Sequence, residues 1–127
     1  MDDLYEGWSG LEQGSRYAHE RILLPLHEGR RAVWRRWDWA AGRREERESR
    51  IEPGTPLVLE GCGALSRANR ALADRAIWLE APAGLRRERA ARRDGDDAWW
   101  EGWRAQEDRF YAREGSRALA DEIRSTV

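Results

Sequence analysis

The chain has 127 residues, with 24 acidic and 23 basic side chains and a formal charge of −1, and this length allows one compact domain. Domains that bind nucleic acid are usually strongly basic, so the near-zero charge argues against that class. No apolar run approaches the roughly 18 residues of a membrane span, and the N-terminus is polar, so we expect neither a membrane partner nor a secretory signal. The single cysteine, Cys62, cannot form an internal disulfide, which favours a cytoplasmic location.

Two features of the composition restrict the chemistry and the core. All 23 basic residues are Arg and none is Lys, so mechanisms that need an amine, such as a Schiff base or a phosphate-loop Lys, are excluded for this chain. Leu, Ile, Val and Phe together supply only 20 residues, and eight Trp add apolar area. We therefore expect a thin hydrophobic core.

Helix and strand signals alternate along the chain. Helical spacing of apolar residues predicts helices over 11–28, 67–73, 83–93, 97–114 and 116–123; apolar or alternating runs predict strands over 31–37, 57–60 and 76–79. The charged segment 40–50 is expected to be a loop or a short helix, and Pro53-Gly54-Thr55-Pro56 breaks the chain. Short apolar strands separated by helices predict an α/β layered domain with a parallel sheet.

Charge is distributed in blocks. Residues 30–50 and 86–93 each carry a net charge of +4, whereas 1–29 and 94–114 each carry −4. Two basic zones on a nearly neutral domain suit a small polyanion such as a nucleotide better than a nucleic-acid duplex.

Glu60 ends the apolar run Leu57-Val58-Leu59 and is followed by Gly61-Cys62-Gly63. At the C-terminal edge of a parallel sheet, where ligands of α/β proteins bind, such a carboxylate can hold Mg²⁺ or orient an attacking group. A strand that ends in a turn with a solvated Glu60 is the simpler interpretation and stays open.

Arg86, Arg89 and Arg93 have helical spacing on one face of the predicted helix 83–93. Guanidinium groups that converge from one face match phosphate oxygens in geometry and charge. An exposed, charged helix face is the commoner role of such a pattern and remains the alternative.

Two further groups of polar residues are weaker candidates. Asp2 and Asp3 would lie near Glu60 if the residues around Leu4 end a strand, and a carboxylate there can accept a proton from a hydroxyl. Arg36 and Asp38 lie among the tryptophans of 34–39, which either stack on a base or sugar or belong to the core.

These segments occur in an order that resembles the uridine-kinase-like P-loop ATP-binding proteins. The resemblance lies in the start, Asp2-Asp3-Leu4-Tyr5-Glu6-Gly7-Trp8-Ser9-Gly10-Leu11, in 36–39, in 59–63, and in the Arg helix with Asp94-Gly95. It covers nearly the whole chain, and the first segment is its most specific part.

The resemblance implies a three-layer fold with a parallel sheet and flanking helices, in one domain over 1–127. It implies phosphoryl transfer from ATP, with Mg²⁺, to a nucleoside, a nucleotide or a similar small acceptor. The region 86–97 would be lid-like, with C-terminal helices over 97–123. The implied roles are catalytic for Asp2, Asp3 and Glu60, metal binding for Asp3 and Glu60, ATP binding for Arg86, Arg89 and Arg93, and acceptor binding for Tyr5, Arg36 and Asp38.

The chain departs from that family in having no GxxxxGK[ST] loop, which normally holds the β and γ phosphates. We therefore expect a kinase-like domain that lacks the first strand, the phosphate loop and the first helix, and that is inactive alone. Strands left without a neighbour would expose sheet edges and favour self-association.

Two other function classes stay open. One is a non-catalytic, Arg- and Trp-rich protein-binding or regulatory module, because both residue types are enriched in binding hot spots. The other is single-stranded nucleic-acid binding by stacking on Trp and Arg, which the net charge of −1 disfavours.

Overall fold

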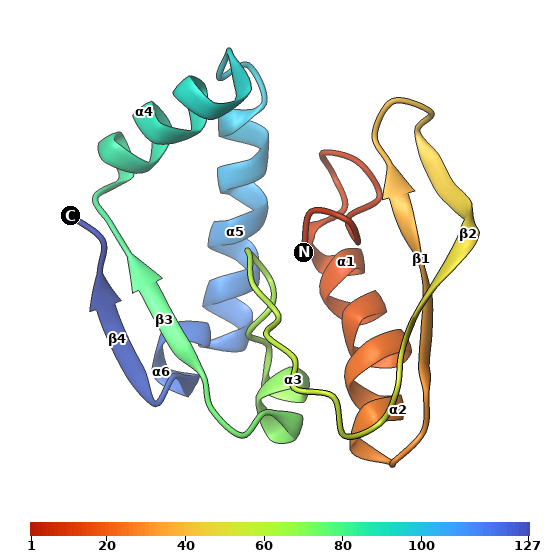
Figure 1. Cartoon of the computed structure of the whole chain (residues 1–127). Helices are drawn as coiled ribbons and strands as arrows, with labels where there is room; N and C mark the ends of the chain where they lie inside the picture. Colours follow the sequence, from red (N-terminus) through yellow and green to blue (C-terminus); the bar gives the residue numbers. More distant parts are fainter.

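Two small, separate sheets lie on opposite sides of the molecule, with α1 and α5 between them (Figure 1). The computed structural model describes all 127 residues. The elements in chain order are α1 (Leu11–Ala18), the π-helical turn η1 (His19–Leu23), α2 (Leu24–His27), β1 (Ala32–Asp38), β2 (Arg43–Ile51), α3 (Arg67–Leu72), β3 (Ile77–Glu80), α4 (Ala83–Asp94), α5 (Trp100–Glu114), α6 (Ser116–Leu119) and β4 (Glu122–Ser125). None of the helices is both long and apolar enough to cross a membrane.

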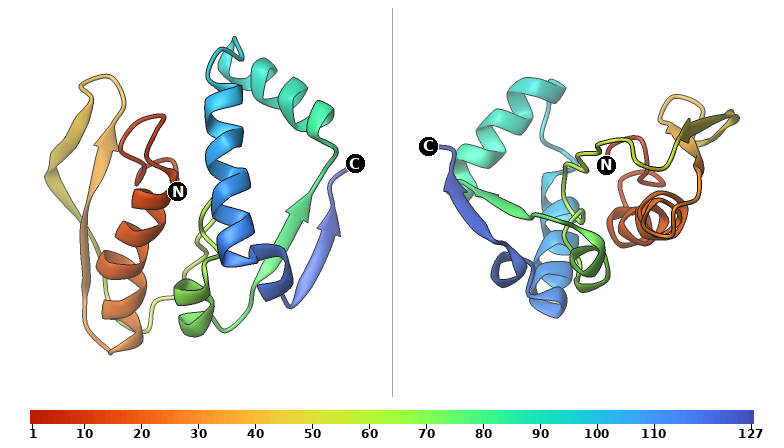
Figure 2. Two further views of the ribbon diagram at one scale, coloured as in Figure 1. Left: turned by 180° about the vertical axis from the view of Figure 1, so that it is seen from behind. Right: turned by 60° about the horizontal axis from the view of Figure 1, so that its bottom comes forward.

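The predicted three-layer fold around one parallel sheet is wrong. β1 and β2 form an antiparallel pair, β3 and β4 form a separate parallel pair, and the two views of Figure 2 show the pairs well apart. The expected strand at 57–60 does not form. Val58 is 89% exposed, and only Leu59 packs against the core. Because no strand lies beside this run, it has no ladder of hydrogen bonds to stabilise an extended strand.

The charged segment 40–50, expected to be a loop or a short helix, instead supplies β2. Asp38 stabilises the turn before it, since its Oδ1 accepts hydrogen bonds from the backbone N–H groups of Ala40 and Ala41, both at 2.9 Å. Cross-strand pairing such as Arg35 opposite Glu48 lets a strand with few apolar residues form at the surface. The hairpin lies alongside α1 and α2 at one side of the molecule (Figure 1), and Ala32 of β1 joins the core there.

The helix predicted over 11–28 is confirmed as one continuous helix made of α1, η1 and α2. Its buried face includes Leu11, Ser15, Ala18 and Ile22, at spacings of three or four residues. Pro25 lies just after the π-helical turn, and because it has no N–H to donate to the preceding turn, the widened geometry there is the expected local adjustment.

The core consists of two small clusters, and only 19 of the 127 residues are buried, which confirms that it is thin. One cluster is formed by Leu4, Ala18, Ile22 and Ala32, and the other by Tyr5, Leu11, Trp103 and Phe110. The N-terminal segment joins them, because consecutive residues Leu4 and Tyr5 enter different clusters. Removing this segment would open both clusters at once.

The C-terminal part of the chain follows the predicted pattern up to residue 119. Helices α3, α4 and α5 and strand β3 lie where the sequence places them, but the helix expected over 116–123 ends at Leu119. Asp121 accepts hydrogen bonds from Arg70 at 2.7 Å and from the Ala76 backbone N–H at 2.8 Å. These two contacts place the chain beside β3, where residues 122–125 pair with it as β4.

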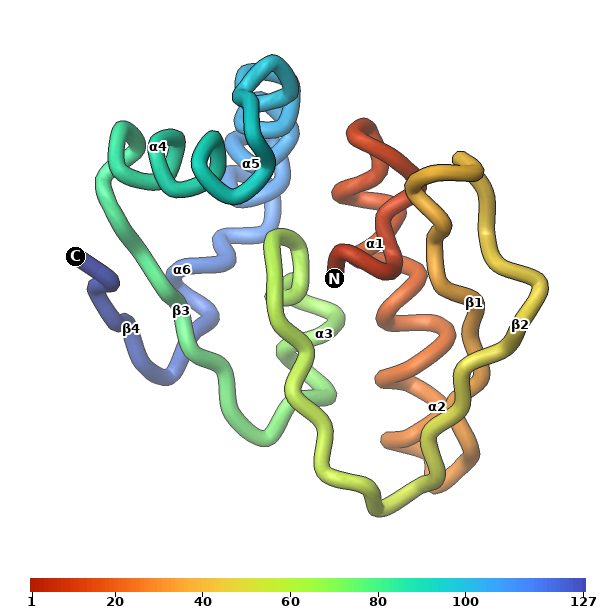
Figure 3. Tube along the Cα trace, turned by 45° about the horizontal axis from the view of Figure 1, so that its top comes forward, coloured from red at the N-terminus to blue at the C-terminus, as the bar shows by residue number.

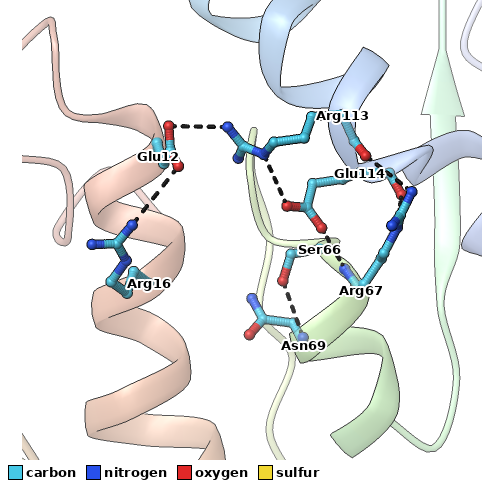
Figure 4. Close-up of polar contacts among 7 residues, drawn as sticks. All are labelled: Glu12, Arg16, Ser66, Arg67, Asn69, Arg113 and Glu114. Atoms are coloured by element: carbon cyan, nitrogen blue, oxygen red, sulfur yellow. Dashed lines mark hydrogen bonds and ion pairs between the residues drawn. The ribbon is translucent and has the colours of Figure 1, made fainter.

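Charged side chains connect α1, α3 and the end of α5 (Figure 4). Arg113 pairs with Glu12 of α1 at 3.2 Å, and Glu114 accepts a 2.9 Å hydrogen bond from the backbone N–H of Arg67. The Ser66 hydroxyl accepts from Asn69 N–H at 3.0 Å and so caps α3. From the hairpin, the segment after β2 runs to the centre of the molecule, close to the N-terminus (Figure 3).

Candidate functional site

The candidate site lies where the N-terminal segment meets the loop 60–63 and helices α4 and α5. The Met1 ammonium donates a 2.7 Å hydrogen bond to the Glu60 carbonyl, and the Tyr5 hydroxyl donates one of 2.6 Å to the Cys62 carbonyl. Gly61 has φ +128°, and a Cβ there would stand 2.7 Å from Cβ of Met1. The tight contact between the two segments therefore requires glycine.

Glu107 connects this loop to α4. One carboxylate oxygen accepts a 2.8 Å hydrogen bond from the Cys62 thiol, and the other accepts one of 3.0 Å from the Arg86 guanidinium. The Glu107 side chain is only 7% exposed, whereas Arg86 is 38% exposed. Burial raises the pKa of Cys62 to about 12, and the negative charge of Glu107 and its hydrogen bond act in the same direction.

Two tyrosines next to Cys62 stay neutral. Burial is the main cause that raises the pKa of Tyr5 and of Tyr111 above the usual value, and the Cys62 group adds to it in both cases. For Tyr5, the charges of Asp2 and Glu60 contribute as well. Both carboxylates therefore act on the Tyr5 hydroxyl, although they are far apart in the sequence.

The side chains of Asp2 and Glu60 are exposed and form no ion pair or hydrogen bond. Hydrogen bonding to Asp94 is the first cause that raises the pKa of Arg93, and the charges of Asp2 and Cys62 also contribute. The Arg93 fork holds Asp94 at 2.7 and 2.9 Å. The charge of Asp2 therefore acts on Arg93, and the charges of Asp2 and Glu60 act on Tyr5.

The three arginines of the predicted phosphate-binding face do not converge on one point. Arg86 is directed to Glu107 and Arg93 to Asp94, whereas Arg89 binds the carbonyl of Thr126 at 2.7 Å and its hydroxyl at 3.1 Å. Arg89 therefore holds the chain end that follows β4. Similar helical spacing did not guarantee a shared target, since each long side chain bends to its nearest acceptor.

The other predicted residues are engaged near the hairpin. Asp3 forms a 2.9 Å ion pair with Arg36, and both side chains are about half exposed. Asp38 serves the turn between β1 and β2. The hydrogen bonds from Met1 to Glu60 and from Tyr5 to Cys62 therefore bring the segment that carries Asp2 and Tyr5 to the loop that begins at Glu60. Arg89 and Asp38 make contacts that support the fold.

The residues present can be compared with what Mg²⁺ requires. No group of three His, Cys, Asp or Glu side chains has the geometry of a metal site, and the carboxylate of Asp3 is held by Arg36. Mg²⁺ in nucleotide sites uses one or two carboxylates, together with phosphate oxygens and water. Asp2 and Glu60 are the free carboxylates available for such a site, and a Mg²⁺ ion held by them would need phosphate oxygens and water as its other ligands.

Sequence reasoning missed Glu107 and Tyr111, and gave Cys62 no role. A signal for Glu107 exists, because it lies four residues after Trp103 and three before Phe110, on the apolar face of the predicted helix 97–114. An acid on an apolar helix face indicates a buried partner. The partner itself, Cys62, is 45 residues away and has no local signal.

Neither the family models nor the curated proteins contain a match to this chain.

Proposed function

We propose that this chain is a kinase-like nucleotide-binding protein that takes the polyphosphate of ATP, with Mg²⁺, at the cluster of Asp2, Glu60 and Arg93. The observation that supports this most is that the side chains of Asp2 and Glu60 are free and lie on segments joined by the hydrogen bond from Met1 to the Glu60 carbonyl. The charges of both carboxylates act on the neutral Tyr5 hydroxyl, and that of Asp2 acts on Arg93. The resemblance of segments 2–11 and 86–95 to uridine-kinase-like ATP-binding proteins agrees with such a site.

Arg93, Asp2 and Glu60 have different roles in the proposed site. Arg93 supplies a planar fork for phosphate oxygens, at the cost of its pairing with Asp94. Asp2 and Glu60 would hold Mg²⁺, which neutralises phosphate charge when bound. Asp2 is also the free carboxylate best suited to accept a proton from an acceptor hydroxyl, because Asp3 is neutralised by Arg36.

Turnover by this chain alone is not part of the proposal. The chain contains no Lys and no GxxxxGK[ST] loop, and the backbone cradle and Lys of such a loop supply much of the phosphate binding in ATP-dependent enzymes. A site built from one or two guanidinium groups and a metal ion is expected to bind weakly, with a dissociation constant of roughly 0.1–1 mM, or about 4–5.5 kcal/mol.

Isothermal titration of the chain with ATP, with and without Mg²⁺, tests the proposal. We expect the Asp2→Asn and Glu60→Gln variants to lose the Mg²⁺-dependent part of the affinity. Arg93→Gln should weaken binding by about fivefold or more, since it removes a charge-assisted contact.

Arg92→Gln is the matched control, because Arg92 is 75% exposed on the same helix and pairs only with Glu88. The proposal would be contradicted if Arg92→Gln weakened MgATP binding as much as Arg93→Gln does. It would also be contradicted if MgATP did not bind at concentrations several times the expected dissociation constant. In that case, binding of an acidic peptide by the Arg-rich helix would favour the protein-binding module instead.

A further inference from the structure

A pocket with a volume of about 400 Å³ opens between Trp8 and Ser9 of the N-terminal segment and residues 98–109, most of which belong to α5. Trp8, Trp99 and Trp103 form its aromatic walls, and Arg109 and Gly102 also line it. This volume is in the range of sites that take small organic molecules. The pocket is distinct from the proposed nucleotide site of Asp2, Glu60 and Arg93. The ring of Trp103 contacts both Tyr5, which lies beside that site, and Trp8, which lines the pocket.

The aromatic walls provide a stacking surface. Trp8 stacks on Trp99 with ring centroids 4.8 Å apart and planes 13° from parallel, and Trp39 lies against it at 5.0 Å. Trp8 is nevertheless 49% exposed. An indole held in place by other indoles and still half exposed offers a preformed surface for another flat ring.

The polar groups of the pocket favour an anion. Arg109 carries the only charge among the eight lining residues, and it forms no ion pair and no hydrogen bond. Both ends of the Gln106 amide are already used, by the Leu11 N–H and by the Trp8 carbonyl. The indole N–H of Trp99 is shielded from solvent and has no acceptor, which leaves Arg109 as the pocket's free charged group.

Gly102 leaves room beside these groups. It lies in the first turn of α5, and a Cβ added there would meet no atom within 4 Å. Glycine in a helix costs up to about 1 kcal/mol relative to alanine, and no packing contact at this position accounts for that cost. The exposed surface at Gly102 is therefore open to a ligand.

We propose that this pocket binds a small planar aromatic acid, with its ring on the Trp8 and Trp99 surface and its carboxylate on the Arg109 guanidinium. Guanidinium and carboxylate form paired, parallel hydrogen bonds, and a flat ring loses little conformational freedom on binding. The inference does not depend on nucleotide binding at the other cluster.

The test uses 2-naphthoate and its neutral isostere 2-naphthamide, followed by the indole N–H signals in ¹H–¹⁵N spectra and by calorimetry. We expect 2-naphthoate to shift the Trp99 indole signal, which Trp99→Phe identifies, and to bind about tenfold or more tightly than the amide. Arg109→Gln should remove that preference. Equal binding of the acid and the amide by the native chain would overturn the proposal.

A second experiment fills the pocket with a larger side chain. Gly102→Leu should abolish binding of 2-naphthoate, whereas Gly84→Leu, a change in α4 that also enters open space away from the pocket, should leave it unchanged. Thermal melting of both variants verifies that they fold. If Gly102→Leu folds and binds as the native chain does, the acid binds elsewhere and the inference is wrong. Arg93→Gln should not affect 2-naphthoate, which separates this result from the test of nucleotide binding.

Discussion

The thiol of Cys62 donates a 2.8 Å hydrogen bond to Oε1 of Glu107, a buried carboxylate 45 residues further along the chain. Because the second oxygen of Glu107 accepts from Arg86, this single side chain joins the loop 60–63, α4 and α5. The bond also keeps the thiol protonated, since a thiolate beside a buried carboxylate would place two negative charges in contact.

Stability should therefore fall at alkaline pH. The pKa of Cys62 is raised to about 12 in the folded chain, above the usual value near 8.5. Above the unfolded pKa the unfolded state binds fewer protons than the native state, so stability decreases as pH rises, by up to roughly 1.4 kcal/mol per pH unit between about 8.5 and 12. Tyr5 and Tyr111 act in the same direction above about pH 10.

Urea unfolding at a series of pH values between neutral and alkaline measures this slope. Cys62→Ser should reduce the slope in the lower part of the range, because the hydroxyl does not titrate there. A flat profile for the native chain would mean that the thiol is not held neutral.

The reactivity of Cys62 should depend on Glu107. At pH 8 the native thiol should react slowly with a disulfide reagent, since the thiolate is the nucleophile and little of it is present. Glu107→Gln removes the neighbouring charge, so we expect the rate to rise by about fivefold or more. Asp108→Asn, an exposed change one residue away on α5, serves as the control. Equal rates in the native chain and in Glu107→Gln would contradict the role given to this carboxylate.

Helices were predictable from this sequence because their signals are local. Ser66, Pro82, Gly95 and Gly115 mark helix boundaries in the sequence as well as in the structure. Strand partners were not predictable in the same way, since a ladder needs a second segment at the right edge. Leu57-Val58-Leu59 has a strong strand composition and no partner. Arg43–Ile51 has a poor strand composition and nevertheless pairs with β1 at residues 43–44 and 48–51.

The candidate site was predictable only in part. The motif at the start, the run that ends at Glu60 and the helix after Pro82 led to Asp2, Tyr5, Glu60 and Arg93, whose roles stay predictions. Arg89 was misjudged because helical spacing fixes the direction of a Cβ but not the end of a long side chain. Glu107 was missed because a buried acid is recognised by its distant partners, Cys62 and Arg86.

Self-association should occur through the sheet formed by β3 and β4. Each strand has one unpaired edge, and Ile77 and Leu79 of β3 are 43% and 58% exposed, which is a surface that pairs readily with another strand. We expect apparent mass to increase with concentration over about 10–200 µM in light scattering coupled to chromatography. Leu79→Lys should shift the chain towards monomer, because a charge opposes edge pairing.

Val127→Lys provides a matched control, since Val127 is 82% exposed and lies outside the strands. An equal effect of the two Lys substitutions would indicate a general influence of charge. A native chain that remains monomeric over the whole range would remove the basis for the prediction.

Gly14 of α1 should tolerate no side chain, because it supports Tyr5. A Cβ at Gly14 would stand 2.7 Å from Cδ1 of Tyr5, whose side chain is buried. The gain of about 1 kcal/mol in helix propensity is therefore outweighed by a packing cost of roughly 1–3 kcal/mol. We expect Gly14→Ala to lower the melting temperature by several degrees, on the order of 2–8 °C.

A substitution at Gly84 distinguishes the effect of the steric clash with Tyr5 from the effect of helix propensity. Gly84→Ala places the same methyl group in open space on α4, so it should raise the melting temperature slightly. Because the Tyr5 hydroxyl binds the Cys62 carbonyl, displacement of Tyr5 in Gly14→Ala should also loosen the loop 60–63 and increase the reactivity of the Cys62 thiol at pH 8. A Gly14→Ala chain with raised stability and an unreactive thiol would show that Tyr5 does not hold this loop in place.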